Sequence, residues 1–328
     1  MNGVLYSFVV LVSLGVIGLP SQSAAAVDRQ EPVKIGALNE GWGPTPATVG
    51  LRDGLLALGY REGEQFTIGV RFTRGDVGAL PAAARELVRA GADIIFATTT
   101  NAVKAAQAAT TEIPIIFSEV VGDVIGLGIV RSFARPGGNV TGVTNLDLEL
   151  NAKRLELFKD IVSGLKRVLF PYVATDPYAA AHAQAYRDAA RELGIILVEK
   201  AVRTPEEARV TFAKVRRTEV DGIIGISSMA LNIPGLVVEA TSQRRIPTMF
   251  NGAFMVELGG LASYGPDFYE SGRQAARLVA KIIKGEKPGQ IPVETNSKIE
   301  LVINLKVAKA LGLKIGPAAL QRADRVIE

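Results

Sequence analysis

The stretch of residues 113–145 most constrains what this chain can fold into. It opens with a short apolar run, residues 113–117, whose length and β-branched residues predict a buried parallel strand. A polar segment interrupted by glycines, residues 118–126, follows at the carboxyl end of that strand, where open α/β sheets bind ligands. The sequence Arg-Pro-Gly-Gly-Asn at 135–139 then predicts a tight turn into a second strand. The chain is therefore expected to cross here from one α/β lobe to another, with a ligand site between them.

Short apolar runs alternate with helical patterns of about 10–15 residues on both sides of this stretch, which predicts right-handed βαβ units and parallel sheets. We expect an α/β fold of two Rossmann-like lobes joined by a multi-strand hinge, because the pattern returns to the first lobe after the second has begun. The expected boundaries are residues 33–145 with 252–288 for lobe 1, and residues 146–251 with 289–328 for lobe 2. The segment LASYG at 261–265 is assigned to lobe 1.

Composition excludes several classes of function. The chain has 328 residues and no cysteine, which rules out disulfides, thiolate metal sites and cysteine nucleophiles. A net charge of +4 lies in scattered basic pairs without interleaved aromatic residues, so a solvated surface is favoured over nucleic-acid binding. The sequence contains no G-x-S-x-G, P-loop or G-x-G-x-x-G pattern, and the single histidine, His182, is expected on a helix surface. We predict no catalytic residue, no metal site and no cofactor.

Residues 1–26 differ from the rest of the chain. Residues 4–19 are apolar, Pro20 interrupts them, and Ala24, Ala25 and Ala26 supply the small residues of a cleavage site. A helix of this apolar length would span roughly 24 Å, less than a hydrocarbon core of roughly 30 Å. We therefore expect a secretory signal peptide and a periplasmic protein, although the segment before the apolar run carries no Lys or Arg.

Several motifs resemble one family. They are GYREG at 59–63, residues 80–91, ARPGGNVTGV at 134–143, AKRLELF at 152–158, GGLASYGPD at 259–267, IIKGEKPGQIPVE at 282–294 and ELVINLKVAKALGL at 300–313. Together they resemble the tryptophan/tyrosine-type ABC transporter substrate-binding proteins, which have the type I periplasmic binding protein fold. The resemblance implies capture of a small solute, often an amino acid, and its delivery to an ABC permease with its ATPase. Asp123 is followed by Val124 where the family usually has Asp-Pro-Val, so the ligand does not carry over.

Residues at the ends of the expected strands are candidates for ligand contacts. Hydroxyl groups and free N–H groups at a helix N-terminus suit a carboxylate, and Asp123 suits an ammonium group, although both sets are also typical helix caps. Aromatic side chains suit the apolar part of a ligand. The candidates are Trp42, Thr98, Thr99, Thr100, Asn101, Val121, Asp123, Asn145, Asp176, Ser228, Phe254 and Tyr264.

The favoured function is a monomeric, exported receptor that captures a small molecule in the cleft between the lobes for an ABC importer. The alternative is a ligand-sensing module for a membrane receptor kinase, which the same two lobes would also serve. An enzyme on an α/β scaffold is the third interpretation, and the absence of a catalytic motif disfavours it.

Overall fold

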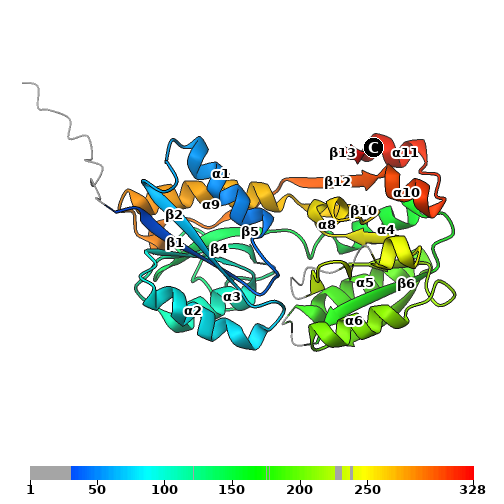
Figure 1. Cartoon of the computed structure of the whole chain (residues 1–328), viewed down its shortest axis with the longest axis horizontal. Helices are drawn as coiled ribbons and strands as arrows, with labels where there is room; N and C mark the ends of the chain where they lie inside the picture. The colour runs from blue at the N-terminus through cyan, green and yellow to red at the C-terminus, as the bar shows by residue number, and fades with distance from the viewer. Residues whose placement is uncertain (1–30, 121, 175, 177, 226–230, 237–238) are drawn as a thin grey trace, which may run out of the picture. The chain divides into compact units, whose positions relative to one another are not determined.

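Two β-sheets form the framework of the chain (Figure 1). The structure is a computed structural model, and it describes residues 31–120, 122–174, 176, 178–225, 231–236 and 239–328. Residues 31–328 form one unit by their contacts. The predicted signal peptide lies outside the described residues. No helix within the described ranges is long and apolar enough to cross a bilayer.

The first sheet has six strands among the described residues, all paired in parallel. Every residue of its central strand β3 is buried, as expected for a parallel strand covered on both faces. From one edge to the other the strands are β11 (Glu294–Asn296), β5 (Val140–Asn145), β4 (Ile115–Val120), β3 (Ile94–Thr98), β1 (Val33–Asn39) and β2 (Phe66–Phe72).

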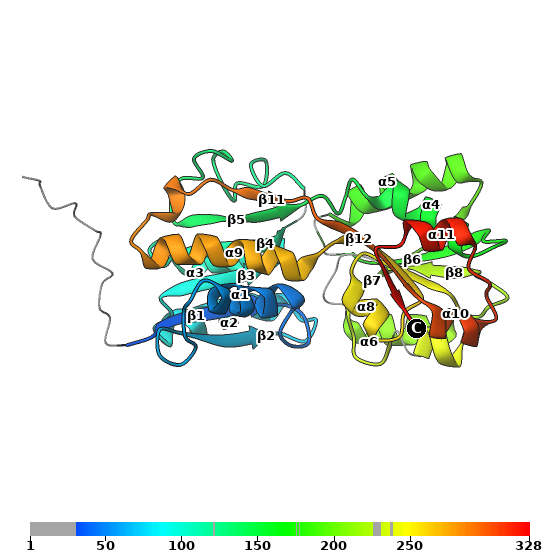
Figure 2. The same ribbon diagram turned by 90° about the horizontal axis from the view of Figure 1, so that it is seen from above.

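Helices cover both faces of the first sheet, with α1 and α9 on one face and α2 and α3 on the other (Figure 1). Their bounds are α1 (Pro46–Ala57), α2 (Leu80–Arg89), α3 (Thr100–Ala109) and α9 (Phe268–Ile283), with short 3-10 turns at η1 (Val77–Ala79) and η4 (Pro288–Gln290). Figure 2 shows α1 and α9 side by side. Glycines let these two helices touch through their backbones. A Cβ atom on Gly50 would lie 1.9 Å from the carbonyl oxygen of Tyr269, and one on Gly272 would lie 2.0 Å from that of Ala47.

The second sheet has seven strands within the described ranges, and of their pairings β10–β12 is the antiparallel one. From edge to edge they are β13 (Arg325–Ile327), β12 (Ile299–Asn304), β10 (Ala262–Pro266), β9 (Thr248–Phe250), β8 (Gly222–Ile224), β6 (Arg167–Val173) and β7 (Ile196–Val202). The helices that connect or adjoin these strands along the chain are α4 (Asn151–Ile161), α5 (Ala179–Leu193), α6 (Pro205–Lys214), α8 (Ala253–Glu257), α10 (Leu305–Leu311) and α11 (Pro317–Arg322), with a π-helical turn η3 (Glu239–Gln243). Gly194 and Gly312 end α5 and α10 in the left-handed conformation, which glycine adopts without a steric penalty.

The chain passes between the sheets three times, and two of the expected boundaries were wrong. The segment LASYG contributes β10, which pairs with β9 and β12 and so belongs to the second sheet. The strand returns beside β9 because α8 is a short crossover between neighbouring parallel strands. Conversely, β11 was expected in lobe 2 but pairs with β5 in the first sheet. The first crossing follows β5, and α9 packs on α1 beside the first sheet.

The second and third crossings are tied to each other. The backbone N–H of Asp267 donates to the carbonyl oxygen of Lys298 at 2.9 Å, and the Lys298 ammonium pairs with the Asp267 carboxylate at 2.8 Å. The side-chain amide of Asn296 also donates to the carbonyl oxygen of Asp267 at 2.8 Å. These contacts make the two crossings one paired connection, as a multi-strand hinge requires.

Candidate functional site

A cavity of about 330 Å³ lies where loops that follow strands of both sheets meet. The loop after β1 contributes its aromatic and proline residues, including Trp42 and Pro44, while α8 contributes Phe254 and its C-cap contributes Leu258. Phe268 comes from the start of α9, and its ring centroid lies 6.5 Å from that of Phe254 in an edge-to-face arrangement. The full lining consists of Gly41, Trp42, Gly43, Pro44, Thr45, Pro46, Glu119, Asn232, Ile233, Pro234, Gly235, Asn251, Phe254, Met255, Leu258 and Phe268. The walls are thus largely apolar, with few polar groups.

Of the described residues that line this cavity, Glu119 is the one with an acidic side chain. It stands near the end of β4 with φ of 58°, a left-handed conformation that is uncommon for a residue with a side chain. The residue is 9% exposed, and its Oε1 atom has no hydrogen-bond partner among the described residues. Burial, together with the nearby charges of Glu40 and Asp147, raises its pKa to about 8, although the backbone N–H of Ala47 at the start of α1 opposes the rise. A buried carboxylate of this kind is a ready acceptor for a cation.

Glu40 lies beside it, immediately after β1, and is 3% exposed. The Thr99 hydroxyl donates to Glu40 Oε2 at 2.5 Å. Thr99 itself has φ of 113°, and its Oγ1 accepts the backbone N–H of Ala102 as the cap of α3. Burial raises the pKa of Glu40 to about 7, while the hydrogen bond from Thr99 lowers it. Two residues in unusual backbone conformations, Thr99 and Glu119, therefore hold two buried carboxylates near enough for their charges to interact.

A third acid, Asp147, follows the first crossing and is compensated by a cation. Its carboxylate pairs with the guanidinium of Arg154, and both side chains are almost wholly buried. Arg154 also donates to Asn151 Oδ1 at 2.8 Å, to the Tyr186 hydroxyl at 2.8 Å and to a backbone carbonyl at 2.6 Å. The side-chain amide of Asn251, a residue that lines the cavity, donates to Asp147 Oδ2 at 3.2 Å. This network connects the cavity wall to α4 of the second lobe.

The expectation that His182 lies on the surface was wrong. It is 5% exposed, and its Nδ1 lies 2.8 Å from the side-chain nitrogen of Asn151, so it belongs to the same buried network. Burial lowers its pKa, which favours the neutral imidazole. The alanine-rich helix α5 suggested exposure, but it turns this face inward against α4. Within the described ranges, no three His, Cys, Asp or Glu side chains are grouped in a way that would hold a metal ion.

Among the predicted ligand contacts, the structure places Trp42 and Phe254 in the lining of the cavity. The Nε1 donor of Trp42 is buried and has no hydrogen-bond partner within the described part of the chain. Thr98, Thr99 and Thr100 are buried where β3 ends and α3 begins, and they do not line the cavity. Thr99 instead contacts the buried Glu40. Asn101, half-buried, occupies the same helix start.

The remaining predicted contacts have local structural roles. Asp123 is exposed and its Oδ1 accepts the backbone N–H of Ile125, while Asp176 accepts that of Tyr178. Asn145 is buried and its Oδ1 accepts the backbone N–H of Asp147. Tyr264 packs against the core of the second sheet. Val121 and Ser228 lie outside the described residues.

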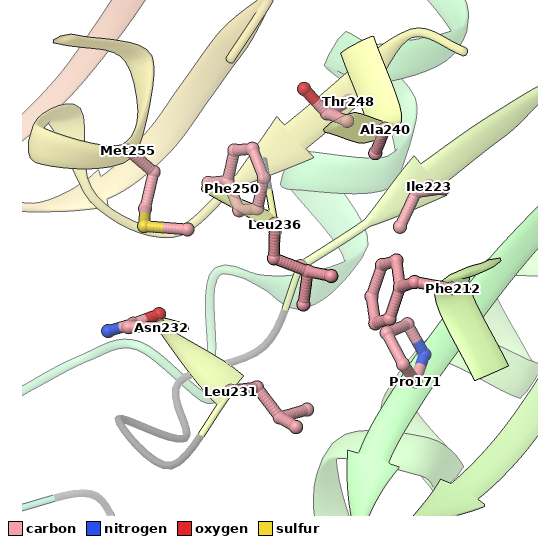
Figure 3. Close-up of a pocket in the computed structure, with 11 residues that line it drawn as sticks. Pro171, Phe212, Ile223, Leu231, Asn232, Leu236, Ala240, Thr248, Phe250 and Met255 are labelled. Atoms are coloured by element: carbon pink, nitrogen blue, oxygen red, sulfur yellow. The ribbon is translucent and has the colours of Figure 1, made fainter. Parts of the chain in front are cut away.

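Two further hollows adjoin the cavity. An apolar pocket of about 30 Å³ shares Asn232 and Met255 with it, and Leu236 lies between Phe250 and Phe212 there (Figure 3). A larger and more open pocket of about 720 Å³ shares Phe254, Leu258 and Phe268 with the cavity, and it adds three acidic side chains and the cation of Arg325. The cavity and the outer pocket therefore share a largely apolar wall.

Sequence reasoning missed Glu40, Glu119 and Asp147. Each stands at or just after the end of an apolar strand of the first sheet, and an acid in that position is a signal that could have been read. The predicted ammonium partner was instead Asp123, which lies four residues beyond Glu119 in the glycine-interrupted segment. No local pattern indicates that β4 turns a glutamate inward through a positive φ.

Comparisons with known proteins agree with this architecture. The family of ABC transporter substrate binding proteins matches residues 33–327. The "Tyrosine-binding protein" of Clostridioides difficile (strain R20291) is 28% identical over 292 residues, which are 87% of this chain and 82% of that protein. A conserved domain protein from Vibrio cholerae is similar in structure, with a TM-score of 0.78 at 29% identity, covering 91% of this chain and 100% of the other.

The solved structure of an ABC domain in complex with L-Trp from Streptococcus pneumonia has a TM-score of 0.75 at 27% identity, with coverage of 90% of this chain and 100% of that one. A solute-binding protein from Agrobacterium vitis, at 17% identity and a TM-score of 0.55, shares the fold over 86% of this chain and 98% of its own. The predicted α/β fold of the type I periplasmic binding proteins is confirmed. The chain belongs to the family of ABC transporter substrate-binding proteins, which bind a small molecule for an ABC transporter.

Proposed function

We propose that this protein is an exported receptor that captures an amino acid with an aromatic or other large apolar side chain and passes it to an ABC importer. One observation carries the proposal. The Glu119 side chain lines a cavity walled by Trp42, Phe254 and Phe268, and its Oε1 atom has no hydrogen-bond partner among the described residues. An ammonium group fits the carboxylate, and an apolar side chain fits the aromatic walls. The volume of about 330 Å³ lies within the usual range of small-molecule pockets.

The names of two relatives support an amino acid. One is a tyrosine-binding protein and the other was solved with L-Trp. The alternative function of a sensor for a receptor kinase has no such support. Export rests on the leader-like composition of residues 1–26, and transport without catalysis rests on the family and on the missing catalytic motifs.

Because the cavity draws its walls from both lobes, a ligand there contacts both at once. Such a ligand stabilises the arrangement in which the lobes meet, in proportion to its extra affinity for that arrangement. The permease would then distinguish loaded from empty receptor by the arrangement of the lobes. Delivery requires no chemical change in the solute.

A thermal-shift screen tests the proposal. The purified protein, freed of carried-over ligand by unfolding and refolding, is heated with each of the amino acids, with purines, with sugars and with small organic acids. A ligand present at 100 times its dissociation constant adds about 2.7 kcal/mol to the free energy of unfolding. We expect aromatic amino acids to give the largest shift and to be recovered unchanged. Stabilisation by sugars alone, or by no small molecule, would contradict the proposal.

A further inference from the structure

The charged groups around Glu119 indicate how the site could bind a cation. This inference rests on the proposed function and goes beyond it. The described lining of the cavity contains Glu119 and no lysine, arginine or histidine. Glu40 is also buried and, although it does not line the cavity, it lies close enough for its charge to raise the pKa of Glu119. Two carboxylates buried together do not both ionise unless a cation joins them, because burial and mutual repulsion each favour the protonated form. The empty site therefore needs either a proton or a cation.

None of the described neighbours supplies that cation. Around Glu119 the charged neighbours are Glu40 after β1 and Asp147 after β5, and the neutral N–H of Ala47 faces it from α1. Asp147 is matched by Arg154, so the guanidinium charge is already used. Around Glu40 the neighbours are the Thr99 hydroxyl, Asn101 and the further acid Asp176.

His182 lies near Asp147 and Asp176, and burial lowers its pKa, which favours the neutral imidazole. The described groups that face the two glutamates are therefore acidic or neutral. In the empty site, a proton on one of the two carboxylates therefore supplies the positive charge that offsets their repulsion.

We propose that Glu119 and Glu40 form a proton-exchanging cation receptor, in which the ammonium group of the solute replaces a proton that the pair holds when the site is empty. The proton leaves the Glu119 carboxyl for the solvent, and the resulting carboxylate accepts an N–H of the ammonium. Glu119 touches the solute. Glu40, held by Thr99, is a positioning residue that acts on the solute through Glu119.

Two measurable consequences follow. Burial raises the pKa of Glu119 to about 8, so binding near pH 6.5 releases about one proton, and the affinity for an ammonium rises about tenfold per pH unit up to about pH 8. Solutes without a cationic amine are not held, because they leave the proton in place and gain no ion pair.

Calorimetry with matched probes tests this inference. L-tyrosine, tyramine and 3-(4-hydroxyphenyl)propionate share one ring and differ in their charged groups, as do L-tryptophan, tryptamine and indole-3-propionate. Titrations at pH 6.5 in phosphate and in MES, which carries no net positive charge, give the number of protons released, since the two buffers differ in ionisation enthalpy. In at least one of the two series, we expect the amino acid and its amine to bind with release of about one proton. We expect each propionate to bind at least 100-fold more weakly than the amino acid of its series.

Three variants separate the roles. Glu119→Gln should remove most of the affinity and also its pH dependence. Glu40→Gln keeps an acceptor for the Thr99 hydroxyl, so binding should persist with its pH midpoint shifted downward, because the repelling charge is gone. A purely structural role of Glu40 would not move that midpoint. Asp123→Asn, on an exposed cap, should leave both affinity and proton release unchanged.

The outcomes distinguish this inference from the proposed function. Tight binding of an amino acid without proton release, or propionates that bind as well as the amines, overturns proton exchange and leaves the receptor function standing. If none of the six probes binds, the inference falls together with the proposed aromatic ligand.

Discussion

The buried ion pair of Asp147 and Arg154 should be essential for the stability of the second lobe. Arg154 is 1% exposed, and its guanidinium donates to the Asp147 carboxylate, the Asn151 amide oxygen and the Tyr186 hydroxyl. Replacing it by methionine keeps much of the side-chain volume but leaves an uncompensated carboxylate and at least two polar atoms without their donor. Breaking a buried pair from one side costs about 3–5 kcal/mol, so Arg154→Met should lower the free energy of unfolding by that amount.

Urea unfolding followed by far-ultraviolet circular dichroism measures this loss. The double variant Asp147→Leu with Arg154→Met removes both charges, and it should lose clearly less than the sum of the two single variants, since no lone charge remains buried. Arg167→Met breaks a pair at the surface of the same lobe, where Arg167 Nη2 lies 2.9 Å from Asp221 Oδ1, and it should change stability far less. Unfolding of Arg154→Met at the wild-type urea concentration, or additive losses in the double variant, would refute the reasoning.

Three further predictions concern other parts of the molecule. Gly50→Ala, whose Cβ would lie 1.9 Å from a carbonyl oxygen of α9, should cost about 1–3 kcal/mol by urea unfolding, whereas Gly69→Ala, with no atom within 4 Å, should not. The folded pKa values of Glu40 and Glu119 lie above the ordinary value of 4.5, so the folded protein binds more protons than the unfolded chain up to about pH 8. The ligand-free protein should therefore lose stability as pH rises from about 5 to about 8.5, and in the Glu119→Gln variant thermal melts should show a weaker loss. Trp42 is the only tryptophan, so its emission should change on binding, and Trp42→Ala should weaken the binding of an aromatic amino acid by about 30-fold or more in calorimetry.

The fold could be predicted further than the site because strand and helix periodicity is a local property. The alternation of apolar runs and helical patterns indicated the elements of both lobes, and it put Trp42 in the loop after the first strand, a loop that lines the cavity. The pairing partner of a strand is not local, and so β10 and β11 were assigned to the wrong sheets.

The acids of the site escaped prediction for a related reason. Nothing in the segment IIFSEV indicates that φ of Glu119 will be 58°, since that angle is imposed by the surrounding packing. Nor does an alanine-rich helix reveal that His182 will face Asn151 where α4 and α5 pack together. Such a position depends on tertiary contacts, and the two residues of the His182 pair are 31 positions apart in the chain.

The three crossings also bear on how the chain can be made. The first sheet receives its edge strand β11 only at Glu294–Asn296, and the second receives β12 and β13 later still. A nascent chain shorter than this cannot complete either sheet, so neither lobe can reach its full structure on the ribosome well ahead of the other. The same arrangement makes C-terminal truncation a loss for both lobes at once.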